Sequence, residues 1–205
     1  MQTPLHAIGL TGGIATGKST CAQILGNLLP ELVLFDADAC VKALYEQKEV
    51  LSALREHFGA GCILGNGSAN KAYLRNRAFS DERDKKFLEQ LFHPLVRQEC
   101  LALLEQTVNK GVSPLFVADV PLLFEGGFDF GQSLNVLVAT SKKTQVKRLV
   151  QRNKWDKDTV HSALSSQIPI EAKYAMADVV FWNEGPQELL RSQCRHFLQS
   201  LSIHF

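Results

Sequence analysis

Residues 12–20 form a glycine-rich stretch that ends in a lysine and two hydroxyl side chains, Gly12-Gly13-Ile14-Ala15-Thr16-Gly17-Lys18-Ser19-Thr20. The stretch satisfies the pattern G-x-x-x-x-G-K-[ST], with an apolar run before it and a helical pattern after it. Its glycines let the backbone curl so that several N–H groups point at a phosphate, and the helix N-terminus adds partial positive charge. Lys18 would reach the outer phosphates and Ser19 would offer its hydroxyl to Mg²⁺. The pattern therefore predicts a nucleoside triphosphate site rather than an ordinary glycine turn.

Carboxylates follow two other apolar runs. Asp36-Ala37-Asp38 comes directly after the run 32–35, and Asp119 ends the run 115–118. Ligands of open α/β sheets bind at the carboxyl ends of the strands, so these acids are expected near the phosphates. One of the first pair could accept a proton from an attacking hydroxyl or hold Mg²⁺ through water, although one of the two could instead cap the helix that begins near Ala39. Asp119 has the position of a metal-supporting acid.

Two further segments carry candidate side chains. The apolar stretch 121–125 contains Leu123 and ends on Glu125, and hydrophobic packing under a loop is its simpler interpretation. Around 145–152, Lys147, Arg148 and Arg152 place cations on one predicted helix and the turn after it. The forked donors of an arginine could offset charge on a transferring phosphoryl group, although a solvated helix face fits each residue about equally well.

The elements that must position these residues follow from the apolar pattern. Continuous rather than alternating apolar runs, separated by helical patterns, indicate strands that are buried on both faces of a parallel sheet. The fold class is therefore α/β. The predicted strands are 5–10, 32–35, 115–118, 134–139 and 179–182, and the predicted helices are 18–29, 41–58, 82–108, 142–152, 156–167 and 186–201. The stretch between the second and third strands is too long for one crossover helix, so it predicts an inserted helical lobe with a loop at 59–70.

A literal guanine-reading motif also occurs. Asn153-Lys154-Trp155-Asp156 matches N-K-x-D, which would favour a GTPase. The motif follows a predicted helix rather than the end of an apolar strand, so its aspartate is not placed beside a base pocket. We interpret it as a polar turn between two helices, within a charged segment that could act as a mobile cover.

Composition limits the class of protein. The chain has 205 residues, 45% of them hydrophobic, and its 22 Lys and Arg against 21 Asp and Glu give a net charge of +1. That balance provides no general field for nucleic acid or anionic membranes. Five scattered cysteines without C-x-x-C spacing predict neither a disulfide framework nor a zinc cluster, and they favour a reducing compartment. With no signal-like start and no membrane-length apolar run, we expect a cytoplasmic protein.

Taken together, these motifs resemble the dephospho-CoA kinase family over nearly the whole chain. The phosphate loop is shared by many families, whereas D-A-D after the second strand, H-P in the insert and P-L-L-F-E after the third strand are more particular. The matching residues are 10–20, 36–38, Leu74-Arg75, Phe79, His93-Pro94, 121–125, Gln145 with Arg148, Gln167, Ala177-Asp178, and Asn183 with Gly185.

The resemblance implies a P-loop kinase fold and transfer of the ATP γ-phosphate to the ribose 3′-hydroxyl of dephospho-CoA. It implies one domain over 1–205, with a five-stranded parallel sheet, a helical acceptor-binding insert at 39–114 and a lid segment at 142–167. Implied partners are ATP, Mg²⁺ and dephospho-CoA, without nucleic acid or membrane, and the protein is expected as a monomer or weak homo-oligomer.

The resemblance also implies roles for individual residues. Asp38 is the expected base, and it would act with Lys18 and Arg148 in catalysis. The expected ATP-binding residues are Gly13, Ala15, Thr16, Gly17, Lys18, Ser19, Thr20, Arg148 and Asn183. The expected acceptor-binding residues are Asp38, Lys42, Lys71, Arg75, His93, Leu123 and Glu125. The expected metal ligands are Ser19 and Asp119, with Asp36 as the alternative to Asp119.

Some positions depart from the family pattern. Lys42 and Lys71 stand where the family usually has arginines, which keeps the charge and loses bidentate geometry. Residues 163–165 lack an arginine that the lid often carries, so either Arg148 or Arg152 would face the transferring phosphate, and Arg148 is preferred. By pattern alone His93 follows apolar positions as a buried histidine at a helix kink would, and only the resemblance indicates an acceptor contact.

Two other functions compete with this hypothesis. A kinase for a nucleoside monophosphate or a sugar would keep the core and the lid and change the insert. A nucleotide-dependent switch would use the insert as a binding surface, and slow turnover without any acceptor would be its signature.

Overall fold

The computed structural model describes residues 5–111 and 113–203, and these fall into two compact units. The described residues up to Asp36 and from Ala102 onward form one unit, which we call the sheet unit. Residues Ala37–Leu101 form the second, the helical unit. The helical unit starts near the expected beginning of the insert and ends earlier than residue 114, because the division falls within one long helix.

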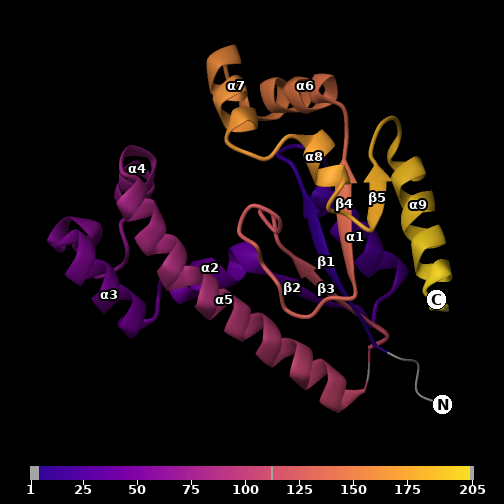
Figure 1. Cartoon of the computed structure of the whole chain (residues 1–205), viewed down its shortest axis with the longest axis horizontal. Helices are drawn as coiled ribbons and strands as arrows, with labels where there is room; N and C mark the ends of the chain where they lie inside the picture. Colours follow the sequence, from indigo (N-terminus) through magenta and orange to yellow (C-terminus); the bar gives the residue numbers. More distant parts are fainter. Residues whose placement is uncertain (1–4, 112, 204–205) are drawn as a thin grey trace. The chain divides into compact units, whose positions relative to one another are not determined.

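The sheet unit is built on five parallel strands, as the apolar runs predict (Figure 1). Their order is β2-β3-β1-β4-β5, so the strand that precedes the glycine-rich stretch is central. Parallel register places Asp36 opposite Asp119, at the carboxyl ends of neighbouring strands. The strands are β1 (His6–Gly12), β2 (Val33–Asp36), β3 (Leu115–Asp119), β4 (Leu134–Ala139) and β5 (Val179–Trp182).

One face of the sheet carries the main core. Helix α1 (Lys18–Leu28) and helix α9 (Gln187–Ser200) pack there against alternate strand residues, among them Ile8, Leu10 and Val136. Ile8, Leu10 and Val136 are fully buried, and burying each such side chain stabilises the fold by roughly 1.5–3 kcal/mol. This packing fixes the first residues of α1 directly after the glycine-rich stretch.

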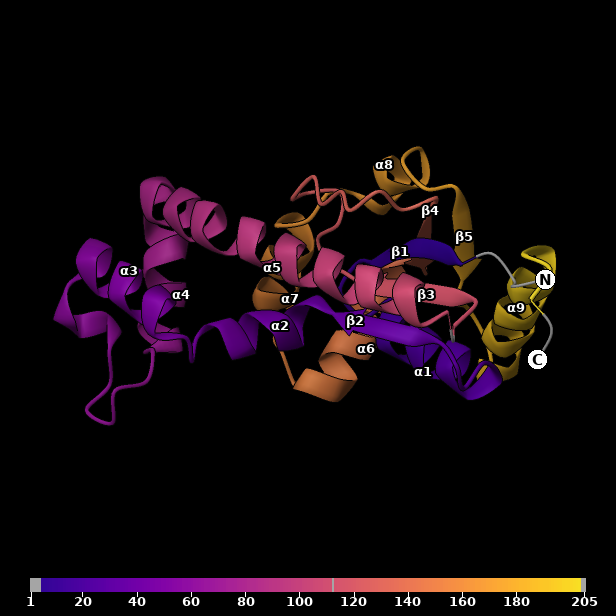
Figure 2. The same cartoon turned by 90° about the horizontal axis from the view of Figure 1, so that it is seen from below.

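The opposite face is covered differently. Gly9 points to this side, where an added Cβ would lie 3.0 Å from the Leu123 side chain, and Phe116 packs on Phe130 with 6.0 Å between ring centroids. Helix α8 (Ile170–Tyr174), which the sequence did not predict, lies on the side of the strands opposite α1 (Figure 2). The segment after β3 is therefore a packed part of the sheet unit.

Two helices follow the carboxyl end of β4. Helix α6 (Lys142–Asn153) is capped by Ser141, whose side chain accepts from the Thr144 N–H at 3.2 Å. Helix α7 (Lys157–Ser165) is capped by Asp156, whose carboxylate accepts from the Thr159 N–H at 2.7 Å. The aspartate of the N-K-x-D sequence is thus a helix cap in a polar turn between two helices, as interpreted from its position.

The helical unit differs from its sequence prediction in two ways. The stretch 41–58 was predicted as one helix, but the structure has α2 (Ala37–Leu44) and α3 (Lys48–Phe58), with Gln47 extended at φ −76° and ψ 134° between them. Helix α4 (Lys71–Ser80) was not predicted, and Asn70 caps it by accepting from the Tyr73 N–H at 3.1 Å. A short 3₁₀ turn, η1 (Ala60–Cys62), and the long helix α5 (Glu82–Lys110) complete the unit.

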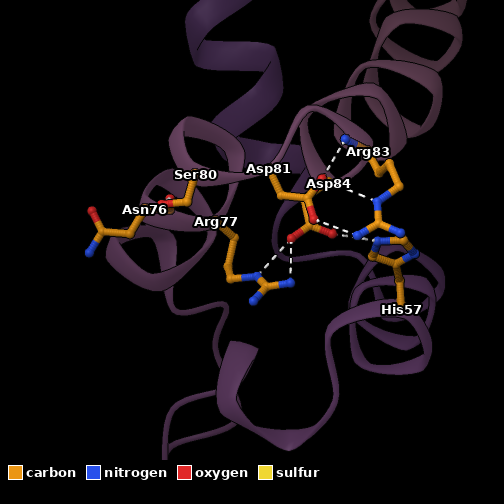
Figure 3. A network of polar contacts seen from close by, with 7 residues as sticks. All are labelled: His57, Asn76, Arg77, Ser80, Asp81, Arg83 and Asp84. Atoms are coloured by element: carbon orange, nitrogen blue, oxygen red, sulfur yellow. Dashed lines mark hydrogen bonds and ion pairs between the residues drawn. The ribbon is translucent and has the colours of Figure 1, made fainter.

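A buried carboxylate joins three helices of this unit. Asp84 of α5 is 5% exposed and accepts from Arg77 Nε of α4 at 2.7 Å and from His57 Nε2 of α3 at 3.0 Å (Figure 3). The His57 ring stacks on Phe87 at 3.8 Å between centroids. Buried carboxylates are costly unless paired, so these contacts hold α3, α4 and α5 in one arrangement.

Among the described residues, no helix combines the length and the apolar character needed to cross a membrane.

Candidate active site

The phosphate loop, residues 12–18, connects β1 to α1 and depends on two of its glycines. A Cβ on Gly12 would lie 2.7 Å from both Thr16 Oγ1 and the Val138 carbonyl oxygen, closer than real Cβ atoms approach. Gly17 has φ 97° at the N-cap of α1, and a Cβ there would collide with the Asn183 side chain. Inside the loop, Thr16 donates from Oγ1 to the Gly13 carbonyl oxygen at 2.8 Å. The two fixed glycines of the pattern are therefore required by close packing and by backbone conformation.

Side chains from distant segments hold the carbonyl groups of this loop. Gln145 Nε2 donates to the Ile14 oxygen at 2.8 Å, and Asn183 Nδ2 donates to the Thr16 oxygen at 2.7 Å. Arg148 Nη1 donates to the oxygens of Ala15 and Thr16, each at 3.1 Å. In a trans peptide the C=O and the following N–H point in opposite directions. The N–H groups of Ala15 and Gly17 are therefore turned away from these side chains, as phosphate binding requires.

Lys18, the first residue of α1, contacts Asp119, the last residue of β3. Its Nζ forms an ion pair with Asp119 Oδ1, and the two side chains are 14% and 10% exposed. The two residues lie 101 positions apart in the sequence, and the register of β1 against β3 brings them together. Both expected functions, a lysine for phosphate oxygens and a carboxylate for a metal, thus occur side by side.

The residues expected to hold Mg²⁺ line one cavity of about 680 Å³. Ser19, Asp36 and Asp119 are among its lining residues, and hydroxyl and carboxylate oxygens are ligands that Mg²⁺ prefers. Across residues 5–111 and 113–203, no three or more His, Cys, Asp or Glu side chains gather in a metal-binding arrangement. This donor set fits an ion that takes one or two protein ligands and fills its remaining positions with phosphate oxygens and water.

A second cavity, of about 480 Å³, opens on the other side of the loop. Ala15, Gly17, Arg148 and Arg152 line it together with Asn183, and its remaining lining residues are Thr20, Gln151, Gly185 and Gln187. Arg148 Nη2 also donates to the Asn183 oxygen at 3.1 Å, so its guanidinium is held by carbonyl groups of the loop and of the residue after β5. Arg152 is exposed and donates from Nε to Asn153 Oδ1 at 2.8 Å. Both candidate arginines therefore border the same cavity.

The first turn of α6, which leads to Gln145 and Arg148, is fixed by Glu184. This carboxylate, just after β5, accepts from the Ser141 N–H at 2.7 Å and from the hydroxyls of Thr140 and Thr144 at 2.8 Å each. Hydrogen bonds from Ser141, Thr140 and Thr144 lower the pKa of the Glu184 carboxyl to about 2. Neither Glu184 nor its partners stood out in the sequence, because the network exists only once β4 and β5 are paired.

The expected acceptor residues are distributed over both units. Asp38 and Lys42 lie on α2, Lys71 and Arg75 on α4, and His93 on α5, and all five are exposed. His93 is thus not the buried histidine that its pattern alone indicates, although Pro94 does lie inside the helix. The Lys71 ammonium sits 5.0 Å from the centroid of the Tyr45 ring.

The remaining two expected residues belong to the sheet unit. Leu123 is 2% exposed, which agrees with the packing alternative for the segment 121–125. Glu125 forms an ion pair with Lys173, and its Oε1 accepts from the Ile168 N–H at 3.2 Å. Lys173 was missed in the sequence, because nothing there indicates that this lysine is buried and paired with a distant carboxylate.

Known proteins share this arrangement. A family model described as dephospho-CoA kinase matches residues 6–188. The dephospho-CoA kinase of Shewanella oneidensis is 36% identical over 187 residues, 91% of this chain and 88% of that protein. A solved structure from Thermus thermophilus matches with a TM-score of 0.80 at 30% identity, over 97% of this chain and 98% of that one.

A solved dephospho-CoA kinase from Campylobacter jejuni has the same fold, with a TM-score of 0.63 at 24% identity over 96% of this chain and 97% of that one. The family match thus includes the phosphate loop, the segments that hold its carbonyl groups and the whole helical unit. With a shared sequence over most of both chains and a site built for a triphosphate, the protein belongs to the dephospho-CoA kinase family.

Proposed function

We propose that the protein transfers the γ-phosphate of ATP to the ribose 3′-hydroxyl of dephospho-CoA, which yields coenzyme A and ADP. Members of the family carry out this last step of coenzyme A synthesis with ATP. The observation that carries the proposal is the phosphate loop, whose carbonyl groups are held from outside so that the N–H groups of Ala15 and Gly17 face away from the holding side chains.

The sheet unit supplies the nucleotide side of the reaction. The loop N–H groups and Lys18 bind the phosphates, and Ser19 with Asp119 would hold Mg²⁺. When bound, the ion neutralises charge on the phosphate oxygens. Arg148 keeps the loop in its binding shape through Ala15 and Thr16, and Arg152 borders the same cavity. Asn183 and Gly185, after β5, lie by the adenine.

The helical unit supplies the acceptor side. Lys42, Lys71, Arg75 and His93 bind dephospho-CoA, with Glu125 contributing from the sheet unit. Asp38 orients the 3′-hydroxyl. The hydroxyl oxygen forms a bond to the γ-phosphorus, the bond from phosphorus to the ADP oxygen breaks, and the hydroxyl proton passes to Asp38.

We also propose that the enzyme works in the cytoplasm as a monomer or weak homo-oligomer. All five cysteines are free thiols, and four of them are buried, which suits a reducing compartment. Light scattering on the purified protein would measure the oligomeric state.

A coupled assay for ADP with a panel of acceptors tests the function. Turnover with dephospho-CoA should greatly exceed turnover with AMP, gluconate or shikimate, and should require Mg²⁺. Preference for one of the other acceptors would identify a different small-molecule kinase. Slow ATP hydrolysis that no acceptor stimulates would instead indicate a nucleotide-dependent switch.

A further inference from the structure

Lys173 is a charged side chain with no exposed surface. It lies on α8, and its Nζ is 2.6 Å from Glu125 Oε1, at the end of the segment after β3. Burying an ammonium group is costly even when it is paired, and well-packed apolar side chains of similar volume are often at least as stabilising. Stability alone is therefore a weak reason for this pair.

The same carboxylate oxygen also holds the end of the lid segment. Ile168 donates its N–H to Glu125 Oε1 at 3.2 Å, three residues after α7 ends at Ser165. The other oxygen, Glu125 Oε2, is buried and has no hydrogen-bond partner among the described residues. The Lys173 ammonium and the Ile168 peptide, directly after the lid segment, thus share one carboxylate oxygen.

Gln167, the neighbour of Ile168, connects this point to the phosphate loop. Its Oε1 accepts from the Ile14 N–H at 2.9 Å, while Gln145 of α6 donates to the oxygen of the same residue at 2.8 Å. Ile14 is therefore held by one glutamine from each end of the lid segment. A cavity of about 270 Å³, lined by Gly13, Gln145, Gln167 and Ile168 among others, lies beside these contacts.

We infer that Lys173 is a positioning residue for phosphoryl transfer, which it influences through Glu125, Ile168 and Gln167. The ion pair fixes the end of the lid segment, and Gln167 then sets the Ile14 peptide of the phosphate loop. The expected effect on the rate rests on the proposed function. The expected effect on the structure rests on the contacts alone. A misplacement of about 1 Å in a reacting geometry can reduce the rate about 10²-fold, so a loosened anchor need not unfold the protein to be harmful.

The test uses the full chain with the double variant Glu125→Gln/Lys173→Met. Removing both charges avoids a buried uncompensated carboxylate, and the glutamine oxygen can still accept from Ile168. We expect kcat to fall by about 10- to 100-fold. Amide exchange at Ile14, measured by NMR, should accelerate at least about tenfold relative to the wild type.

The matched control is Lys157→Met/Glu171→Gln, which removes one charge of each sign at exposed positions of α7 and α8. It should leave kcat and Ile14 exchange unchanged. Unchanged kcat in Glu125→Gln/Lys173→Met, or a lower kcat with unchanged Ile14 exchange, would overturn the inference.

A second variant, Gln167→Met, keeps the ion pair and breaks only its connection to Ile14, so the inference stays testable if the double variant does not fold. It should also lower kcat and accelerate Ile14 exchange. Adding Glu125→Gln/Lys173→Met to the Gln167→Met variant should lower kcat by a smaller factor than adding the same pair to the wild type. Fully additive effects would contradict a route through Gln167. If the wild type does not phosphorylate dephospho-CoA, the proposed function fails, and Ile14 exchange still tests the anchor.

Discussion

Lys18 combines an ion pair with Asp119 and a proposed contact with the phosphates of ATP. Its ammonium lies against Asp119, and the proposed triphosphate offers it further anionic oxygens. Charge that spreads over the phosphoryl oxygens in the transition state is stabilised by such a cation. Lys18 is not part of the apolar cluster that forms the main core, so the packing of that core does not depend on it.

We therefore expect Lys18→Ala to reduce phosphoryl transfer by about 10²- to 10³-fold or more without loss of the fold. Initial rates in the coupled assay measure the first effect, and circular dichroism should show an unchanged spectrum. Wild-type turnover in a properly folded variant would remove Lys18 from the catalytic site.

The D-A-D sequence does not show which of its two carboxylates, Asp36 or Asp38, accepts the proton of the acceptor hydroxyl. Asp36 ends β2 and lines the cavity with Ser19 and Asp119, whereas Asp38 lies in the first turn of α2. Asp38→Asn keeps the size of the side chain and cannot take a proton, so we expect kcat to fall about 10²- to 10⁴-fold with nearly unchanged ATP affinity. Asp36→Asn should affect the acceptor step less. If Asp36→Asn is the more damaging of the two in kcat measurements, the roles are reversed.

Among the elements, α6 is positioned through its first turn by Glu184, and this contact depends on pH. Glu184 has a pKa of about 2 in the folded protein, below the ordinary value of 4.5, so the folded state favours its charged form. The resulting stability is fully present above pH 4.5 and is lost as the pH falls toward 2.

Glu184→Gln should accordingly have a lower Tm than the wild type at pH 7, and the difference should shrink between pH 4.5 and 2. Thermal unfolding followed by circular dichroism across this range measures both. A difference in Tm that stays constant down to pH 2 would show that the charge of Glu184 contributes nothing to stability.

The elements also show what sequence patterns can and cannot reveal. All five strands were predicted to within about two residues, because strands buried on both faces give continuous apolar runs. The break at 45–47 was missed because apolar periodicity continues across it, and α4 was missed although Asn70 is a typical cap. The side chains that hold the phosphate loop could not be assigned that role from sequence, since Gln145 and Asn183 meet residues 14–16 only through the tertiary fold.

At the scale of the whole molecule, the proposed function divides the two substrates between the two units. The cavities beside the phosphate loop are lined by sheet-unit residues. We propose that recognition of dephospho-CoA falls largely to the helical unit, where the Asp84 contacts with Arg77 and His57 hold α4 and its cations in place.

Arg75→Ala tests this division. We expect a higher KM for dephospho-CoA, a lower kcat, or both, with ATP binding nearly unchanged, because the variant removes an exposed cation of α4. Arg55→Ala, which removes another exposed cation of the helical unit, serves as the control. Steady-state kinetics with each substrate varied in turn measure the effect, and unchanged acceptor constants would place Arg75 outside the site.

The strand order has a consequence for how the chain is made. β1 is synthesised before its partners β3 and β4. His6 can pair only after Leu115 has been made, and Ile8 can pair with β4 only after Leu134 has been made. The helical unit is contiguous in the chain and complete by Leu101, and contacts between residues close in sequence form faster than distant ones. On the ribosome, the acceptor-side helices can therefore fold while β1 is still unpaired. A nascent chain that ends before residue 134 carries the phosphate-loop sequence without the sheet that shapes it.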